Sequence, residues 1–129
     1  MRLLLLAMAG GALGAGARHL VNIACARCLS PGFPWATLLV NVLGAVLMGL
    51  VVEAIGRRFG AADTGVAWRT FLATGILGGF TTFSAFSLDA ANLMNRGDNA
   101  HALAYVLGSV VLSILGLYAG LAIARAVFP

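Results

Sequence analysis

The sequence predicts an all-α membrane protein, in which four transmembrane helices form one domain and the third helix is broken near its middle. First, 61% of the 129 residues are hydrophobic and only 9% are charged, whereas an ordinary soluble domain has about a quarter of its residues charged. Second, charge-free stretches cover residues 3–17, 28–52, 70–88 and 102–124. Each approaches or exceeds the roughly 20 apolar residues that cross a bilayer as a helix. Third, glycines and threonines gather in the middle of the third stretch. With their short connections, the four spans make residues 1–129 a single transmembrane domain.

The charged residues argue against nucleic-acid binding and carry a weak signal for membrane orientation. The eight cations are all arginine and the formal net charge is +4, but they are dispersed between apolar runs instead of forming a basic face. An even number of spans puts both termini on one side. That side carries Arg2, Arg57, Arg58, Arg69 and Arg125, against Arg27 and Arg96 on the other, with Arg18 inside span one toward that other side. This modest excess favours cytoplasmic termini and is small enough to allow insertion in both orientations.

Prolines, glycines and charges set the boundaries of the four spans. Span one covers about residues 3–26 and is interpreted as a membrane helix rather than a cleaved secretory signal. A connection with Pro31 and Pro34 leads to span two, about residues 35–55. A polar loop then leads to span three, about residues 70–93, and residues 96–99 separate it from span four, about residues 102–127. The charges of the polar loop are Arg57, Arg58, Asp63 and Arg69.

Cys25 and Cys28 form a Cys-x-x-Cys motif at the end of span one. A pair at this spacing can bind a metal ion or cycle between thiol and disulfide. A single pair is more typical of two small apolar residues where a helix leaves the membrane, and this is the interpretation that the sequence favours.

The 17 glycines indicate close helix packing, because glycine lowers helix propensity unless close backbone approach compensates for it. Three pairs spaced by four residues each put two glycines on one helix face. They are Gly10 and Gly14, Gly75 and Gly79, and Gly116 and Gly120. Such faces serve either packing within one chain or dimerisation, and the sequence favours neither.

Span three is expected to break near its middle, because Gly75, Gly78 and Gly79 lie just before two threonines. An unwound turn inside a membrane is tolerated only where its freed carbonyl and amide groups face protein, water or an ion. The alternative is a continuous helix, in which the glycines serve packing and the Thr and Ser hydroxyls bond back to the preceding turn.

Phe80, Phe83 and Phe86 recur every three residues and form a stripe along span three. On an ordinary helix such rings would face lipid or the core. Here hydroxyl groups interleave with them, at Thr82, Ser84 and Ser87. Because the edge of an aromatic ring carries partial positive charge, rings presented edge-on suit a route for a small anion.

Further polar side chains lie at membrane depth in spans two and four. Thr37 and Asn41 are one turn apart, while Tyr105, Ser109 and Ser113 share one helix face. A buried amide or hydroxyl without a partner costs about 2–7 kcal/mol. These groups are therefore expected to bond to each other, to the backbone or to a passing ion, and hydrogen bonding between helices alone is the simpler alternative.

The acidic residues separate an anion passage from a proton-coupled antiporter, which needs a titratable carboxylate near the midplane. Glu53 and Asp89 lie at span ends, and neither His19 nor His101 is central. A passage lined by donors without acids suits an anion rather than a cationic drug. Two alternatives remain, a small multidrug-type proton-coupled transporter and a structural membrane subunit.

Residues 78–87 read GGFTTFSAFS, and this segment resembles the signature of the Fluc (CrcB) family of fluoride channels. Residues 11–18, GALGAGAR, and residues 37–44, TLLVNVLG, support the resemblance, which covers essentially the whole chain. It implies a dual-topology homodimer, not an enzyme, in the bacterial plasma or inner membrane. Its two antiparallel subunits would enclose two pores for the passive export of cytoplasmic fluoride.

The resemblance also implies roles for individual residues. Phe83 and Phe86 would contact fluoride, with Asn41 as the pore-facing amide. Backbone carbonyls of Gly78 and Thr81 from both subunits would bind a structural sodium ion at the dimer centre. Arg18 would be a vestibule or structural arginine, and Asp89 matches the acidic residue after the motif. Ala85 departs from the pattern, because many family members have a second hydroxyl there. The remaining matches form a polar track of Thr37, Ser84, Tyr105, Ser109 and Ser113.

Fluoride chemistry agrees with these residue types. Fluoride is the most strongly hydrated halide, so it leaves water only where several donors replace its hydration shell at once. The amide of Asn41 and the hydroxyls of the track supply such donors. The width of a track between packed helices would exclude larger halides.

Overall fold

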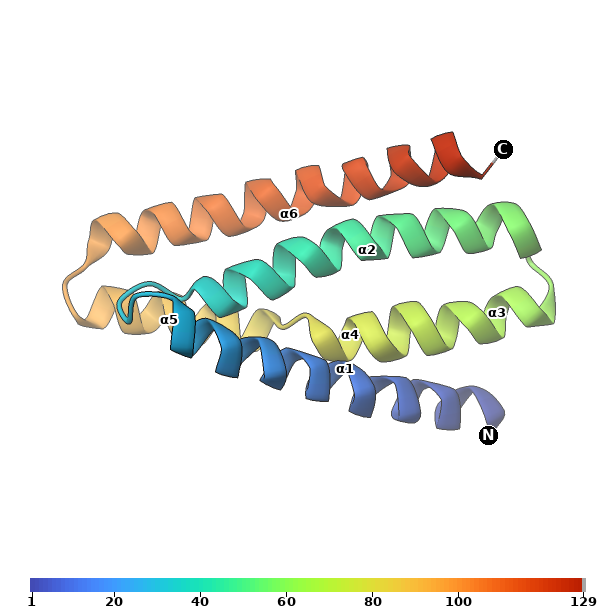
Figure 1. The fold of residues 1–129 in the computed structure, drawn as a ribbon, viewed down its shortest axis with the longest axis horizontal. Helices are drawn as coiled ribbons and strands as arrows, with labels where there is room; N and C mark the ends of the chain where they lie inside the picture. The colour runs from blue at the N-terminus through green and yellow to red at the C-terminus, as the bar shows by residue number, and fades with distance from the viewer. Residues whose placement is uncertain (129) are drawn as a thin grey trace.

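The computed structural model describes residues 1–128, and its fold is a bundle of long helices (Figure 1). Four helical stretches are long and apolar enough to cross a membrane: Arg2–Cys28, Trp35–Phe59, Asp63–Asn95 and Asn99–Val127. They alternate in direction, so that both termini and the connection after the second stretch lie at one end of the molecule. The prediction of an all-α protein with four spans is therefore confirmed.

The bundle contains two closely packed pairs. α1 (Arg2–Cys28) packs along the first half of the third stretch, and α2 (Trp35–Phe59) packs along α6 (Asn99–Val127). In Figure 1, α6 lies at one side and α1 at the other, with α2 and the third stretch between them. A cluster of buried side chains joins the third stretch to α6; it consists of Phe86, Ala90, Leu93, Ala102 and Tyr105.

The backbone geometry of the third stretch changes along its length. α3 (Asp63–Arg69) continues into η1 (Thr70–Leu77), a π-helix after which the N–H of Gly78 reaches the carbonyl of Ala73, five residues back. α4 (Gly78–Phe80) then ends, Thr81 and Thr82 have extended backbone angles, and α5 (Phe83–Asn95) begins. π-helices are rare in proteins overall, and those that occur are often found at functional sites. The sequence pattern did not predict η1.

Glycines set the close contact between α1 and the third stretch. A Cβ atom on Gly14 would collide with the carbonyl oxygen of Ile76. From the opposite side, a Cβ atom on Gly79 would lie 3.0 Å from the Cα atom of Gly11. A Cβ atom on Gly10 would lie 2.9 Å from the Cα atom of Gly75, so the first two glycine pairs face each other within one chain.

The third glycine pair has the same role between α2 and α6. A Cβ atom on Gly120 would collide with the carbonyl oxygen of Val46, and one on Gly116 would lie 3.0 Å from the Cγ2 atom of that valine. Gly49 on α2 approaches the carbonyl of Leu117 in the same way. All three pairs therefore serve packing within one chain, a choice that the sequence left open.

Replacing Gly14 with alanine is expected to destabilise the folded subunit by about 3 kcal/mol, because the new methyl group meets backbone atoms that cannot move aside. Gly16→Ala is the matched control on the same helix, since a Cβ atom there meets nothing within 4 Å. That control should be neutral or stabilising by up to about 1 kcal/mol. Thermal unfolding of the purified variants in detergent measures both changes. A Gly14→Ala protein that unfolds like the wild type would show that α1 does not pack in this way.

The connection between α2 and α3 is shorter than the predicted polar loop. α2 runs on to Phe59 instead of ending near residue 55, and the third stretch begins at Asp63 instead of near residue 70. The loop charges Arg57, Arg58, Asp63 and Arg69 therefore lie within helices, and only residues 60–62 connect them. Long arginine side chains reach from a helix end to the polar membrane surface, so such charges do not terminate a membrane helix. Gly60, with a φ of +56°, follows the last residue of α2.

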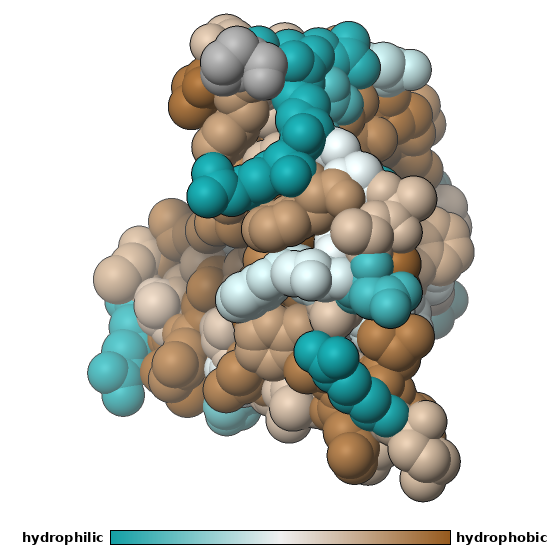
Figure 2. Space-filling view, turned by 90° about the vertical axis from the view of Figure 1, so that its right-hand side faces the viewer, coloured by the Kyte–Doolittle hydropathy of each residue, from teal (hydrophilic) through white to brown (hydrophobic). Residues whose placement is uncertain are grey.

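Glu53 joins α2 to α6 at the end of the molecule that carries the termini. Its Oε1 atom accepts from Arg57 Nε at 3.0 Å and from Arg125 Nε at 3.1 Å. Figure 2 views this end and shows hydrophilic side chains in separate patches among apolar ones. Hydrophilic side chains are thus interrupted by apolar ones on this face.

Cys25 and Cys28 lie in the last turn of α1, where Cys25 is half-buried and Cys28 is exposed. Both thiols are free in the described part of the chain. Their position at the end of the first span agrees with the interpretation as small residues where the helix leaves the membrane.

Candidate functional site

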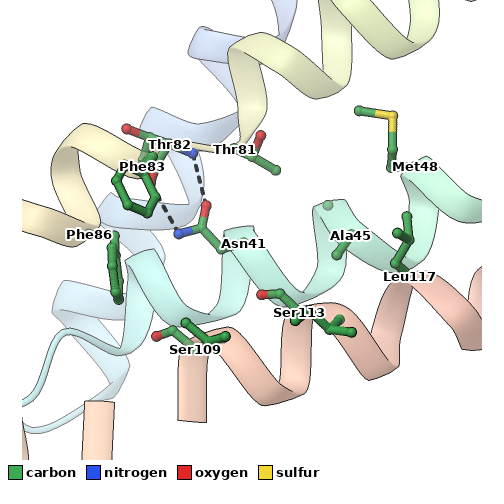
Figure 3. Close-up of a pocket in the computed structure, with 13 residues that line it drawn as sticks. Asn41, Ala45, Met48, Thr81, Thr82, Phe83, Phe86, Ser109, Ser113 and Leu117 are labelled. Carbon is green, nitrogen blue, oxygen red and sulfur yellow. Dashed lines mark hydrogen bonds between the residues drawn. The ribbon is translucent and has the colours of Figure 1, made fainter. Parts of the chain in front are cut away.

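A groove of about 440 Å³ runs between α2, α6 and the extended residues that separate α4 from α5 (Figure 3). Its wall is mostly apolar, with side chains such as Met48 and Leu117 at one end. Residues predicted for an ion pathway make up much of the rest: Asn41, Phe83, Phe86, Ser109 and Ser113. The fold thus brings together predicted residues from three helices that are distant in the sequence.

Asn41 holds the extended segment through both ends of its side-chain amide. The N–H of Thr82 donates to Asn41 Oδ1 at 2.8 Å, and Asn41 Nδ2 donates to the carbonyl of Thr82 at 3.1 Å (Figure 3). The extended backbone explains why the N–H of Thr82 is available, because no continuous helix directs it to the carbonyl of Gly78. Sequence reasoning placed Asn41 in a pathway but missed its bonds to Thr82, which depend on a contact between two different spans.

The phenylalanine stripe divides into two environments. Phe83 is 78% exposed and Phe86 is 9% exposed, with their ring centroids 5.3 Å apart and their planes at 39°. Phe80 is buried against α2, where a Cβ atom on Gly44 would lie 3.4 Å from its ring. Phe83 and Phe86 line the groove and Phe80 does not.

Ser109 places a buried hydroxyl on the wall of the groove. The residue is 5% exposed, and its Oγ atom has no hydrogen-bond partner among residues 1–128. Ser113 lies one turn further along α6 and is half-buried. Buried polar atoms without partners are few in native proteins and call for an explanation such as a site for an ion or water.

Thr37 and Tyr105 do not line this groove but converge on Asp89. Thr37 Oγ1 donates to Asp89 Oδ2 at 2.6 Å, and the Tyr105 hydroxyl donates to the same oxygen at 3.4 Å. Tyr105 is fully buried, with its ring between those of Phe33 and Phe86 at centroid distances of 5.6 and 5.3 Å. The polar groups therefore continue past Phe86, away from the groove.

Asp89 is the residue whose place sequence reasoning missed. The sequence analysis put Asp89 at a span end, but in the structure it lies within α5, six residues before the last residue Asn95, and it is half-buried. The spacing in the sequence could have indicated this place, because Asp89 follows Phe86 by three residues and residues three apart share a helix face.

Arg18 belongs to a second pocket, of about 280 Å³, between α1, α2 and α5. Thr37 and Thr82 also line this pocket, so it adjoins both the Asp89 cluster and the extended segment. Ala85 lies on its wall without a hydroxyl, as the sequence indicated. Ser84 lines neither cavity; it is exposed, with its Oγ atom 3.1 Å from Thr82 Oγ1.

The end of α4 carries the carbonyls considered for a metal ion. Gly78 begins α4 and Thr81 directly follows it, at the carbonyl end of the first half of the third stretch, where a helix dipole is negative. Among residues 1–128, no three His, Cys, Asp or Glu side chains form a cluster able to hold a metal.

Comparison with known proteins gives one consistent family. The family model described as "CrcB-like protein, Camphor Resistance (CrcB)" matches residues 5–121. The "Fluoride-specific ion channel FluC" of Chelativorans sp. is 55% identical over 96% of this chain and 97% of its own length. "Fluoride-specific ion channel FluC 2" of Nitrobacter hamburgensis is 52% identical over 94% of this chain and 95% of its own. The "Fluoride-specific ion channel FluC" of Mesorhizobium japonicum is 48% identical over 95% of this chain and 95% of its own length.

Proposed function

Because this chain belongs to the CrcB-like family, we propose that it is a fluoride-selective ion channel through which cytoplasmic fluoride leaves passively, down its gradient. The observation that carries the proposal is the groove that is lined together by the unpartnered hydroxyl of Ser109, the amide of Asn41 and the rings of Phe83 and Phe86. It is a channel and not an enzyme, since ion passage requires no covalent step.

The chemistry of the groove suits a small, strongly hydrated anion. Ser109 has a hydroxyl hydrogen that bonds to no other described residue, and Asn41 has a second N–H on Nδ2 beyond the one that bonds Thr82. Phe83 and Phe86 add ring edges with partial positive charge. Several donors along one path together replace the hydration shell of the anion, and a path between packed helices disfavours larger halides.

We propose that the working unit is an antiparallel homodimer. The groove is open along one side and Phe83 is 78% exposed beside it, so a second copy is needed to enclose the path. Two copies in opposite orientations would complete two equivalent pores. The small arginine excess at one end of the chain agrees with insertion in both orientations.

A structural sodium ion at the centre of this dimer fits the oxygen atoms that the chain offers. Backbone carbonyls are ligands of hard cations, and Gly78 and Thr81 lie where the helix dipole is negative. One chain supplies two carbonyls, and the second copy would supply two more. When bound, the ion contributes a fixed positive charge beside the pathway of an anion.

The protein is a multi-pass membrane protein by its four spanning helices, and we place it in the bacterial plasma or inner membrane. Fluoride efflux from liposomes that contain the purified protein, followed with a fluoride electrode, tests the proposal. Efflux that needs no proton gradient supports a channel. A structural subunit would give no efflux, and a proton-coupled transporter would stop when protons equilibrate.

Ser109→Ala separates a role in permeation from a role in helix packing. Removal of a hydroxyl without a partner should leave the free energy of unfolding unchanged or raise it. Fluoride efflux should nevertheless fall by about tenfold, because a hydrogen bond to a charged ion is worth about 1.5–3 kcal/mol. Unfolding and efflux are measured on the same preparation. A variant that loses stability but retains wild-type efflux would assign Ser109 to packing.

Dual topology is tested with a single cysteine in the short connection between α2 and α3. Ala61→Cys, in a chain with Cys25→Ser and Cys28→Ser, puts an exposed thiol at the terminal end. An impermeant maleimide added to intact cells should label about half of the molecules, because the arginine bias is weak, and a permeant reagent should label all of them. Complete labelling or complete protection would contradict an antiparallel dimer.

A further inference from the structure

We propose that two side-chain oxygens, Asn41 Oδ1 and Thr82 Oγ1, create the cation site by diverting the N–H groups that would otherwise occupy the carbonyls of Gly78 and Thr81. Asn41 and Thr82 are thus positioning residues for a site that neither of them contacts through its side chain. The inference rests on the proposed sodium site and adds the cause of its formation.

The first diversion frees Gly78. In a continuous α-helix, the N–H of a residue donates to the carbonyl four positions back, so the N–H of Thr82 would bond to Gly78. Here it donates to Asn41 Oδ1 at 2.8 Å. The same amide holds the carbonyl of Thr82 at 3.1 Å, which fixes the peptide in its extended orientation.

The second diversion frees Thr81. In a continuous helix, the carbonyl of Thr81 would accept from the N–H of Ala85. That N–H instead donates to Thr82 Oγ1 at 3.2 Å, because Thr82 is the N-terminal cap of α5. The N–H of Thr81 itself still bonds to Leu77 at 3.0 Å, so the first helical half is intact up to the extended residues. For both carbonyls assigned to the cation, those of Gly78 and Thr81, the N–H group four residues later therefore bonds to a side-chain oxygen instead.

Close packing keeps the extended residues near Asn41. A Cβ atom on Gly44, one turn after Asn41 on α2, would collide with Thr81 Cγ2. α2 therefore approaches the extended segment closely enough for a short amide side chain to reach it. Asn41 therefore connects the anion groove to the cation site. Its side chain lines the groove, and its Oδ1 atom holds the N–H that would otherwise bond to the carbonyl of Gly78.

The test measures sodium binding without fluoride transport. The thermal unfolding midpoint of the purified protein is titrated with NaCl at constant ionic strength, with N-methyl-D-glucamine as the replacing cation. Asn41→Leu has a similar volume but no acceptor, so Thr82 can return its N–H to Gly78. The sodium concentration for half-maximal stabilisation should rise about tenfold, as expected for the loss of about one hydrogen bond. The control Ser113→Ala on α6 changes neither of the two diverting bonds and should retain sodium affinity.

Thr82 provides an independent pair. Thr82→Val removes the oxygen that accepts from the N–H of Ala85 and should weaken sodium binding in the same way. Thr82→Ser keeps that oxygen and should retain the wild-type sodium concentration for half-maximal stabilisation. If Asn41→Leu does not fold, the two Thr82 variants still test whether a side-chain acceptor is needed for sodium binding. Wild-type sodium affinity in folded Asn41→Leu or Thr82→Val would overturn the inference and leave the sodium site itself standing. A wild-type protein that sodium does not stabilise would overturn the sodium site and the inference, while fluoride efflux from liposomes would still test the channel separately.

Discussion

Phe83→Ile is expected to reduce fluoride efflux by orders of magnitude while the protein folds and dimerises normally. Isoleucine keeps an apolar side chain but removes the ring and its positively polarised edge. Phe83 is 78% exposed in one chain, so its replacement costs little packing within the subunit. Liposome efflux combined with size-exclusion chromatography of the same sample measures function and assembly together.

Phe86→Ile should cause a similar loss of efflux with a larger loss of stability. The Phe86 ring is buried against Tyr105, at a centroid distance of 5.3 Å, and a smaller side chain leaves space in that cluster. Phe80→Ile is the matched control, because Phe80 is buried outside the groove, and it should change stability more than efflux. Three variants that assemble and conduct alike would mean that the stripe serves packing and that the aromatic mechanism is wrong.

Asn41→Asp is expected to abolish fluoride efflux in an assembled dimer. The substitution keeps the size of the side chain and replaces its N–H donors with a carboxylate oxygen. That oxygen faces the carbonyl of Thr82, which Asn41 Nδ2 now holds at 3.1 Å, and it places negative charge on the wall of an anion path. Efflux is measured in liposomes, and assembly is checked by cross-linking.

Asn41→Leu is the companion variant, because it removes the donors without adding charge. If loss of the donors is the cause, both variants should lose efflux, and if repulsion is the cause, only Asn41→Asp should. Wild-type transport by an assembled Asn41→Asp dimer would remove Asn41 from the pore.

Properties of single spans were predictable from the sequence because they depend on neighbouring residues. The bilayer needs about 20 apolar residues per helix, and the charge-free stretches are of that order, so the number of spans followed directly. The helix ends did not follow, because charged side chains such as Arg57 and Arg69 extend to the membrane surface and allow the helix to continue.

Contacts between spans were decided by the tertiary structure. The glycine pairs were visible in the sequence, but their use within one chain depended on which faces meet, for example Gly14 with Ile76. Thr37 and Tyr105 were predicted as donors, and their common acceptor Asp89 emerged only when three helices were placed together.

The sequence by itself determined which chemical groups this protein carries into the membrane, such as the amide of Asn41, a pair of phenylalanines, and hydroxyls on a common face of span four. Only the tertiary structure decided what they bond to, as with Asn41 and the backbone of Thr82. The reason is that helix periodicity reports the face on which a side chain lies, whereas a hydrogen bond of about 3 Å requires two chain segments to approach to a defined distance. In this bundle, that distance is set by glycines on separate helices.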